Sequence, residues 1–185
     1  MGRDYMVFTF KQCMEKWLSV YQINKAVREG KLYKLETGIY SDSPCALTLE
    51  IIVAKYPYAI ITMDTAFYYH GLTDVIPDDF CIATLESAKA LQDTRVRQYY
   101  IRKDLLNIGV VTMERRGVSF KIYDKERMLI ELLRFKNIYP YDYYKKILSN
   151  YRKQVYELDI ERIQEYADIF PKRKMISEAL STEVF

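Results

Sequence analysis

Two helix-start signals close to the beginning of the chain constrain its fold more than any other feature of the sequence. Thr9 stands three residues before Gln12, and Ser19 stands three residues before Gln22. In such a capping box, the hydroxyl oxygen accepts a hydrogen bond from the backbone N–H of the third helical residue, whose side chain accepts one from the backbone of the cap. The two signals predict two short helices joined with almost no linker.

Apolar side chains recur at helical spacing in both segments, so one face of each helix is expected to be buried. The expected core residues are Phe10, Met14, Trp17 and Leu18 in the first helix, and Val20, Ile23 and Val27 in the second, with Ala26 and Leu32 adjoining. Gly30 is expected to end the second helix, because glycine readily adopts the left-handed conformation that follows a helix C-terminus.

The spacing of apolar residues changes from helical to strand-like after Gly30. Residues 31–35 alternate, residues 36–38 have turn chemistry, and residues 39–41 form a second short strand pattern. This arrangement predicts a β-hairpin. Two capped helices followed by a hairpin are the outline of a winged helix-turn-helix, which we place in residues 1–43, with a boundary at Ser43 and Pro44.

The remainder of the chain predicts a mixture of short strands and helices. Strands are expected at residues 59–62, 80–84, 95–102, 110–114 and 118–123, and helices at residues 46–55, 64–70, 141–151, 159–170 and 174–180. Asp124 is expected to cap a further helix whose inner face carries Met128, Leu129, Leu132 and Leu133. The predicted fold class is therefore α+β: a small N-terminal winged helix-turn-helix followed, over residues 44–185, by a small mixed sheet with a helical C-terminal tail.

The second helix carries the strongest functional signal. If its apolar stripe faces the core, the side chains that face outward are Tyr21, Gln22, Asn24, Lys25 and Arg28. Lys and Arg neutralise phosphates, and Asn and Gln pair with adenine, so this face is predicted to contact DNA. Lys31 and Lys34 on the hairpin are predicted to contact the adjacent DNA backbone. The alternative is an ordinary solvated helix face.

A second basic surface is predicted in residues 95–103, where cations are interleaved with aromatic side chains. Its candidate contacts are Arg95, Arg97, Arg102 and Lys103. Such a stretch can stack on and neutralise nucleic acid, but charges on an edge strand also prevent aggregation, and both interpretations stay open. Because the whole chain carries a net charge of only +3, we expect a monomer to bind DNA weakly and specific binding to require two copies on a repeated site.

The sequence offers little that an enzyme would need. The three cysteines form no CxxC pair, His70 is the only histidine, and there is neither a phosphate-binding glycine loop nor a nucleophile elbow. We therefore expect no catalytic residue, no cofactor and no metal. The alternative is a metal-dependent nuclease that uses Asp78, Asp79, Glu86 or Glu114. No apolar run approaches about 20 residues and no signal peptide is recognisable, so a cytoplasmic protein without a membrane partner is expected.

Three segments of the chain resemble, in the correct order, the AbiEi-type antitoxin family. Ile23 together with residues 28–40 (REGKLYKLETGIY) resembles the winged-helix end of that family. Residues 61–73 (ITMDTAFYYHGLT) look like its next signature, and residues 117–131 (GVSFKIYDKERMLIE) are similar to its strand-to-helix element. The resemblance covers most of the chain between the second capping signal and the helix after Asp124.

The resemblance implies an antitoxin of a two-gene abortive-infection (type IV) toxin–antitoxin system, whose partner gene encodes a nucleotidyltransferase-like toxin. In that family the winged helix represses its own promoter by binding inverted repeats of double-stranded DNA, which implies a homodimer on the DNA. The C-terminal domain counters the toxin, and no stable complex is required. A second hypothesis is a protein-interaction antitoxin module that has lost DNA recognition, because few residues precede Thr9.

Overall fold

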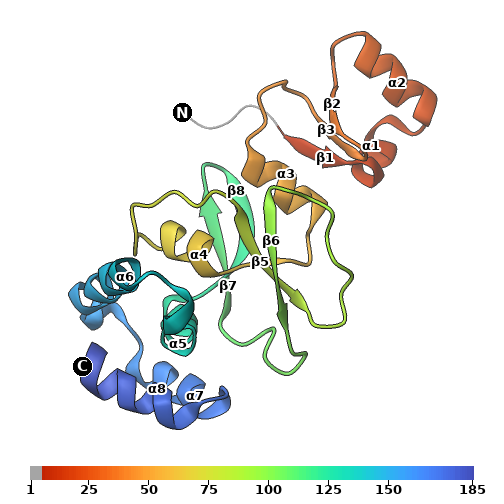
Figure 1. Ribbon diagram of the computed structural model, residues 1–185. Coiled ribbons are helices and arrows are strands. Elements are labelled where there is room, and N and C mark those ends of the chain that lie inside the picture. The colour runs from red at the N-terminus through yellow and green to blue at the C-terminus, as the bar shows by residue number, and fades with distance from the viewer. Residues whose placement is uncertain (1–5) are drawn as a thin grey trace. The chain divides into compact units, whose positions relative to one another are not determined.

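The computed structural model describes residues 6–185, which divide into two compact units (Figure 1). The first unit contains the described residues up to Ala59 together with Glu114–Phe120, and the second contains Ile60–Met113 and Lys121–Phe185. This division differs from the predicted one at residue 43, because the helix that follows Pro44 packs on strands of the first unit. Residues 1–5 of the predicted winged helix-turn-helix lie outside the described residues.

The first unit is built from three helices and a three-stranded sheet. Its elements are β1 (Val7–Thr9), α1 (Phe10–Trp17), α2 (Val20–Arg28), β2 (Tyr33–Glu36), β3 (Ile39–Ser41) and α3 (Thr48–Lys55). The strands are antiparallel in the order β1-β3-β2, and both Val7 and Tyr33 lie opposite Ser41. The predicted helices and hairpin are confirmed, whereas the sequence pattern does not predict β1.

The two capping signals are confirmed to different degrees. At Thr9 both hydrogen bonds form: the backbone N–H of Gln12 donates to Thr9 Oγ1 at 3.3 Å, and the backbone N–H of Thr9 donates to Gln12 Oε1 at 2.8 Å. At Ser19 only the first half forms, with the backbone N–H of Gln22 donating to Ser19 Oγ at 3.2 Å. The exposed side chain of Gln22 is therefore not used in the cap.

The core of the first unit corrects three predictions. Its buried members are Phe8, Cys13, Ile23, Ala26, Leu32 and Tyr40, with Met14, Trp17 and Val27 packed against them. Phe10 and Val20, predicted to lie inside, are 41% and 50% exposed, because each is the first residue of its helix and extends past the edge of the core. Leu18, 77% exposed, lies beyond the end of α1 in the left-handed conformation, with a φ of 62°.

The second unit contains a mixed sheet and most of the helices. Its elements are β4 (Ile60–Ile61), α4 (Met63–Tyr69), β5 (Phe80–Leu85), β6 (Val96–Ile101), α5 (Lys125–Arg134), α6 (Tyr141–Lys153), α7 (Ile160–Ile169) and α8 (Arg173–Ala179), and short 3-10 or π turns occur at Lys136–Ile138, Val155–Glu157 and Leu180–Val184. The strands β7 (Val110–Arg115) and β8 (Val118–Tyr123) complete the sheet, although their adjoining ends, within Glu114–Phe120, are grouped with the first unit. The strand order is β6-β5-β4-β8-β7, with β5 antiparallel to β4 and parallel to β6. The predicted mixed sheet and helical tail are confirmed.

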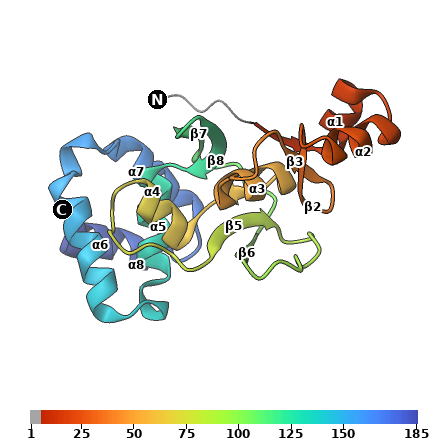
Figure 2. The same cartoon turned by 90° about the horizontal axis from the view of Figure 1, so that it is seen from above.

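Helix α5 forms the centre of the second unit. Asp124 caps it as predicted, since the Asp124 carboxylate accepts a hydrogen bond from the backbone N–H of Arg127 at 2.7 Å. The predicted inner face is confirmed, but the helix is buried on its other sides as well, because α7 and α8 pack against it. Figures 1 and 2 show α6, α7 and α8 gathered around α5. No helix within residues 6–185 has the length and apolar character needed to cross a membrane.

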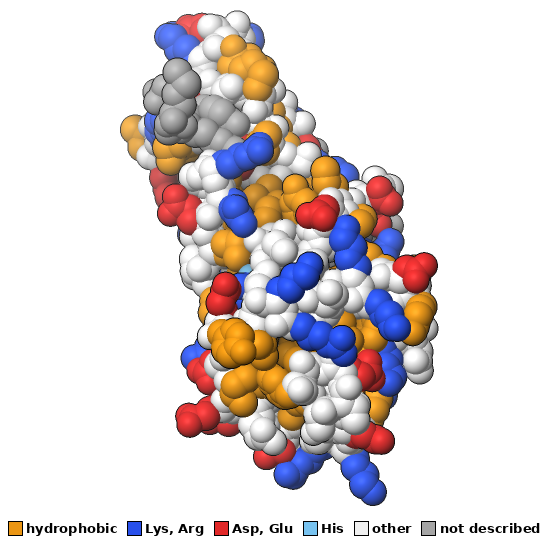
Figure 3. Space-filling model, turned by 90° about the vertical axis from the view of Figure 1, so that its left-hand side faces the viewer, with side chains coloured by type: hydrophobic (Ala, Val, Ile, Leu, Met, Phe, Trp, Pro, Cys, Tyr) orange, Lys and Arg blue, Asp and Glu red, His pale blue; other side chains and the backbone are white. Residues whose placement is uncertain are grey.

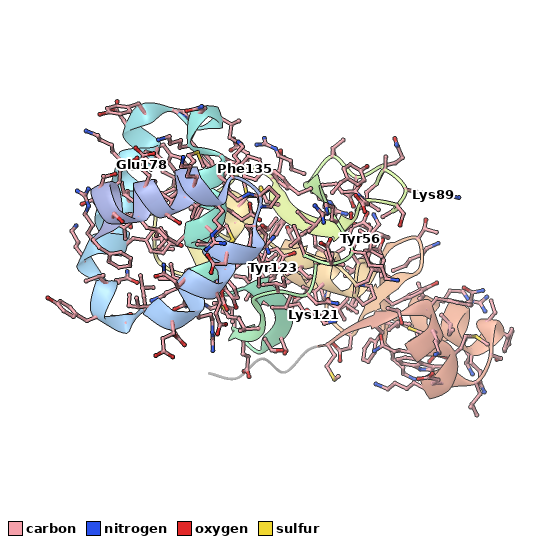
Figure 4. All side chains as sticks on the ribbon, turned by 90° about the horizontal axis from the view of Figure 1, so that it is seen from below. Tyr56, Lys89, Lys121, Tyr123, Phe135 and Glu178 are labelled. Atoms are coloured by element: carbon pink, nitrogen blue, oxygen red, sulfur yellow. The ribbon has the colours of Figure 1, made fainter. Side chains whose placement is uncertain are left out.

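Arg127 lies fully buried on α5, where an exposed charge would be expected from helical periodicity alone. Its guanidinium donates to the Glu131 carboxylate at 2.6 Å and to the Leu105 carbonyl at 3.3 Å. Its carbon lies 3.7 Å from the centre of the Phe170 ring and 4.7 Å from that of Tyr123. Tyr123 lies among the packed side chains of the second unit, whereas Lys89 extends outward from the loop before β6 (Figure 4).

Candidate nucleic-acid interface

Helix α2 carries the candidate DNA-facing side chains on the side away from the core. Ile23 and Ala26 are buried, and with about 3.6 residues per turn the positions opposite them are Tyr21, Lys25 and Arg28. All of the side chains that the sequence predicts to face outward are exposed: Tyr21, Gln22, Asn24, Lys25 and Arg28. The orientation expected for this helix is therefore the one that the structure has.

The hairpin that follows α2 adds two cations. Lys31 lies immediately after Gly30, which has a φ of 69° and ends the helix, and Lys34 lies in β2. Both lysines are exposed. The first unit therefore presents cations from both the helix and the hairpin.

Glu29 reduces the positive charge at the end of α2. Its carboxylate accepts a hydrogen bond from Lys31 Nζ at 2.7 Å and lies 3.8 Å from Lys25 Nζ. The hydrogen bond and positive charge of Lys31 lower the pKa of Glu29, so this carboxylate stays ionised. Arg28 and Lys34 form no ion pair with any of residues 6–185, and they are the cations most available to a phosphate.

The second predicted basic surface is largely neutralised by neighbouring carboxylates. Arg95 pairs with Asp93 at 2.7 Å, Arg97 with Asp79 at 3.2 Å, and Arg102 with Asp104 at 2.6 Å. Strand β6 stands at the edge of its sheet, which favours the role of preventing aggregation. Figure 3 shows Lys and Arg dispersed among acidic and hydrophobic side chains on the face that it presents. Lys103 is also exposed, and it alone of the four has no carboxylate partner within residues 6–185.

A small polar pocket in the second unit was not found from the sequence. It has a volume of about 160 Å³ and is lined by Asp64, Val75, Ile76, Pro77, Asp78, Asp79, Cys81, Arg97 and Tyr143. The Tyr143 hydroxyl donates to Asp64 Oδ1 at 3.2 Å. Burial raises the pKa of the Asp64 carboxyl and of the Cys81 thiol, so the thiol stays protonated and is a poor nucleophile. These residues come from distant parts of the sequence, and no local motif indicates that they meet.

The residues of the alternative nuclease do not form a metal centre. Asp78 and Asp79 line the small pocket, and Asp79 is paired with Arg97. Glu114 belongs to the first unit. Within residues 6–185, no three His, Cys, Asp or Glu side chains come together in a way that could hold a metal ion.

His70 has a structural role in the second unit. Its Nε2 lies 2.6 Å from the carbonyl oxygen of Tyr123. Because a carbonyl oxygen only accepts hydrogen bonds, Nε2 must carry a proton and donate. This bond joins the end of α4 to the end of β8.

Comparison with known proteins adds no relative from which a function could be transferred. No protein-family model matches the chain, and no curated protein sequence matches it either. The candidate interface is therefore judged by its own geometry and chemistry.

Proposed function

We propose that the first unit binds double-stranded DNA as a winged helix-turn-helix, with α2 in the major groove. The observation that carries this proposal is the exposed stripe of Tyr21, Asn24, Lys25 and Arg28, which lies opposite the buried side of α2. The order of elements supports it: α1 precedes α2 directly, and β2 and β3 follow as a hairpin with β1 beside β3. In proteins with this motif, the second helix enters the major groove while neighbouring groups hold the phosphates.

We further propose that the chain is a non-enzymatic antitoxin that represses its own promoter and counters a nucleotidyltransferase-like toxin. The support is the resemblance of residues 28–40, 61–73 and 117–131 to the AbiEi-type family. Conformation explains all four glycines in these segments, because each has a φ between 69° and 78°, where other residues are strained: Gly30, Gly38, Gly71 and Gly117. Inverted repeats in the promoter would be bound by a homodimer.

The DNA-binding proposal is tested by titrating the full chain against duplex DNA from upstream of its own gene, over a range of salt concentrations. Wild type is expected to bind, and Lys25→Ala or Arg28→Ala to bind more weakly. Removing one phosphate-binding cation lowers the slope of log K against log salt by about one. Lys174→Ala is the matched control, because Lys174 is exposed on α8 in the second unit. Unchanged affinity and slope in both variants would remove these residues from the interface.

The antitoxin proposal needs its own test. The reading frame beside this gene is expected to encode a nucleotidyltransferase-like protein that arrests growth when it is expressed alone. Co-expression of this chain is expected to restore growth. A neighbouring protein that arrests growth regardless of this chain would refute the antitoxin role and leave the DNA-binding proposal standing.

A protein-interaction module without DNA binding is the second candidate function. The observation that favours it is Glu29, whose carboxylate engages Lys25 and Lys31 and so competes with phosphate for both. The same titration separates the two functions. If wild type binds neither the upstream DNA nor unrelated DNA at low salt, the interaction module is favoured.

A further inference from the structure

The beginning of α2 exposes apolar side chains that the first unit does not need for its own core. Leu18, Val20 and Tyr21 are 77%, 50% and 69% exposed. The core of this unit is already formed by other residues, including Cys13, Ile23 and Leu32, all of which are buried. Apolar groups concentrated at one turn, directly beside the candidate DNA-facing stripe, require a separate explanation.

The start of α2 has a well-defined backbone. The Leu18 N–H donates to the Met14 carbonyl at 2.9 Å, and the Ser19 N–H donates to the Trp17 carbonyl at 2.8 Å. The Ser19 hydroxyl then caps α2. These bonds set the direction in which the first turn of α2 leaves α1, so the side chains of that turn are presented on a fixed backbone.

Val20 and Asn24 are neighbours along one flank of the exposed stripe. Residues four apart in a helix lie one above the other on the same face. Neither side chain is engaged elsewhere: Asn24 is exposed and forms no hydrogen bond with any of residues 6–185, and Val20 is outside the core. The flank therefore combines an amide with a pair of methyl groups, and it borders the cations Lys25 and Arg28.

This combination matches the major-groove edge of A·T base pairs. Adenine presents the N7 acceptor and the N6 donor, which the amide of Asn pairs with in bidentate fashion, and thymine presents a C5-methyl group that apolar side chains contact. A protein partner would gain from the apolar groups alone, but it would have to bury the adjacent amide of Asn24 and the guanidinium of Arg28, which have no partner among residues 6–185, and such burial is costly.

We infer that the first turns of α2 read an A·T-rich site, with Asn24 on an adenine and Val20 on the C5-methyl group of a thymine in an adjacent base pair. The inference rests on the proposed function, because it requires α2 to enter the major groove. In this arrangement, Tyr21 and Arg28 lie on either side of these two base pairs and contact the sugar and phosphate groups of the DNA. Val20 is thus a specificity-determining residue whose exposure has a chemical reason.

The test uses the full chain and works without a known operator sequence. Duplexes selected by the wild-type chain from a random pool are resynthesised with deoxyuridine in place of thymidine, which removes only the C5-methyl groups. For wild type, the affinity is expected to fall about fourfold for each contacted methyl group, the equivalent of one buried methylene. For Val20→Ala, which keeps the Cβ methyl group but loses both Cγ methyl groups, the ratio of thymine to uracil affinity is expected to be smaller than for wild type.

A matched control and a second probe complete the experiment. Val75→Ala removes an equally exposed valine, since Val75 is 51% exposed and lies in the second unit, and it is expected to keep the wild-type ratio of thymine to uracil affinity. Duplexes with 7-deazaadenine lack the N7 acceptor. Wild type is expected to bind these duplexes more weakly than it binds the adenine duplexes. Asn24→Ala is expected to bind both kinds of duplex with equal affinity.

Each outcome decides a different question. If wild type binds its selected DNA equally well with thymine and with uracil, the inference is overturned while the proposed DNA binding stands, and this arm needs no variant to fold. The inference is also overturned if Val20→Ala weakens binding but keeps the wild-type ratio of thymine to uracil affinity. If the pool yields no bound duplex, the proposed function itself fails. Apolar docking of a protein would then be the remaining explanation of the exposed turn.

Discussion

Leu18 provides a direct test of how the turn between α1 and α2 is held. It has a φ of 62°, and its side chain is largely exposed. A non-glycine residue in the left-handed region costs about 1 to 2 kcal/mol relative to the right-handed one. Glycine removes that cost but raises the conformational entropy of the unfolded chain, which is worth about 0.4 to 1 kcal/mol in the opposite direction.

The difference between the two effects lies between about 0 and about 1.6 kcal/mol, so Leu18→Gly is expected to stabilise the protein, by a central value of about 0.8 kcal/mol. The loss of apolar packing hardly reduces this gain, because 77% of Leu18 is already exposed. In a protein of this size the shift in melting temperature is about 1 to 4 °C. Thermal unfolding followed by circular dichroism, together with urea unfolding, measures both quantities.

Leu18→Ala is the matched control for the backbone argument. Alanine removes nearly the same apolar surface but keeps the Cβ atom, so it keeps the strain, and its stability is expected to stay close to that of wild type. A Leu18→Gly variant that is less stable than wild type would refute the reasoning. So would a Leu18→Ala variant that is stabilised as much as Leu18→Gly, since the gain would then not depend on the left-handed conformation.

Three further predictions follow from charged residues. Glu29→Gln is expected to raise the affinity for DNA, because Lys25 and Lys31 lose their shared carboxylate. The slope of log K against log salt is expected to steepen by up to about one unit. Equal binding by variant and wild type would contradict this prediction. Burial raises the pKa of Asp64, so the folded state holds that proton more tightly than the unfolded chain does, and the ionised carboxyl destabilises the fold near neutral pH. Asp64→Asn is expected to be more stable than wild type at neutral pH. The gain in urea unfolding is expected to shrink as the pH falls through the raised pKa of the folded state and to vanish below the ordinary pKa of aspartate. Arg127→Ala is expected to lower the free energy of unfolding by about 3 kcal/mol or more, because it leaves a cavity and removes one of the two guanidinium groups bound to the buried Glu131. The control is Arg173→Ala, which breaks the exposed ion pair with Asp168. This variant is expected to lower the free energy of unfolding by less than about 1 kcal/mol.

Local signals in the sequence predict the elements whose determinants are themselves local. Thr9 and Asp124 cap their helices through hydrogen bonds to residues three positions away. Gly30 ends α2 with a positive φ, which other residues adopt only with strain. In each case the physical cause lies within one turn of the chain, so the neighbouring residues are sufficient to predict the element.

Predictions are incomplete or wrong where the cause is distant in sequence. Strand β1 has only three residues, and its partner strand β3 lies about 30 residues further along the chain, where Ser41 faces Val7. No local pattern therefore indicates the pairing. Helical periodicity places Val20 in the core with Ile23 and Val27, which is wrong, because periodicity does not show that the core ends before the first turn of α2. Arg127 is buried because Phe170 and Tyr123 cover it, a consequence of tertiary packing.

The exposure of Val20, which the sequence predicts to be buried, makes the candidate interface chemically more specific. Had Val20 been buried, the exposed stripe would have consisted of amides, cations and one tyrosine, a set that many solvated helices share. With Val20 exposed beside Asn24, the same stripe contains an apolar group at a defined place next to an amide. In the inferred complex this pair distinguishes one base pair from another, which phosphate contacts by cations do not. If the left-handed turn at Leu18 serves only to direct this first helical turn, Leu18→Gly should retain the wild-type preference for thymine over uracil while gaining stability. If the Leu18 side chain itself contacts DNA, the variant should gain stability and lose affinity together, and the two measurements on one variant therefore assign the role of the turn.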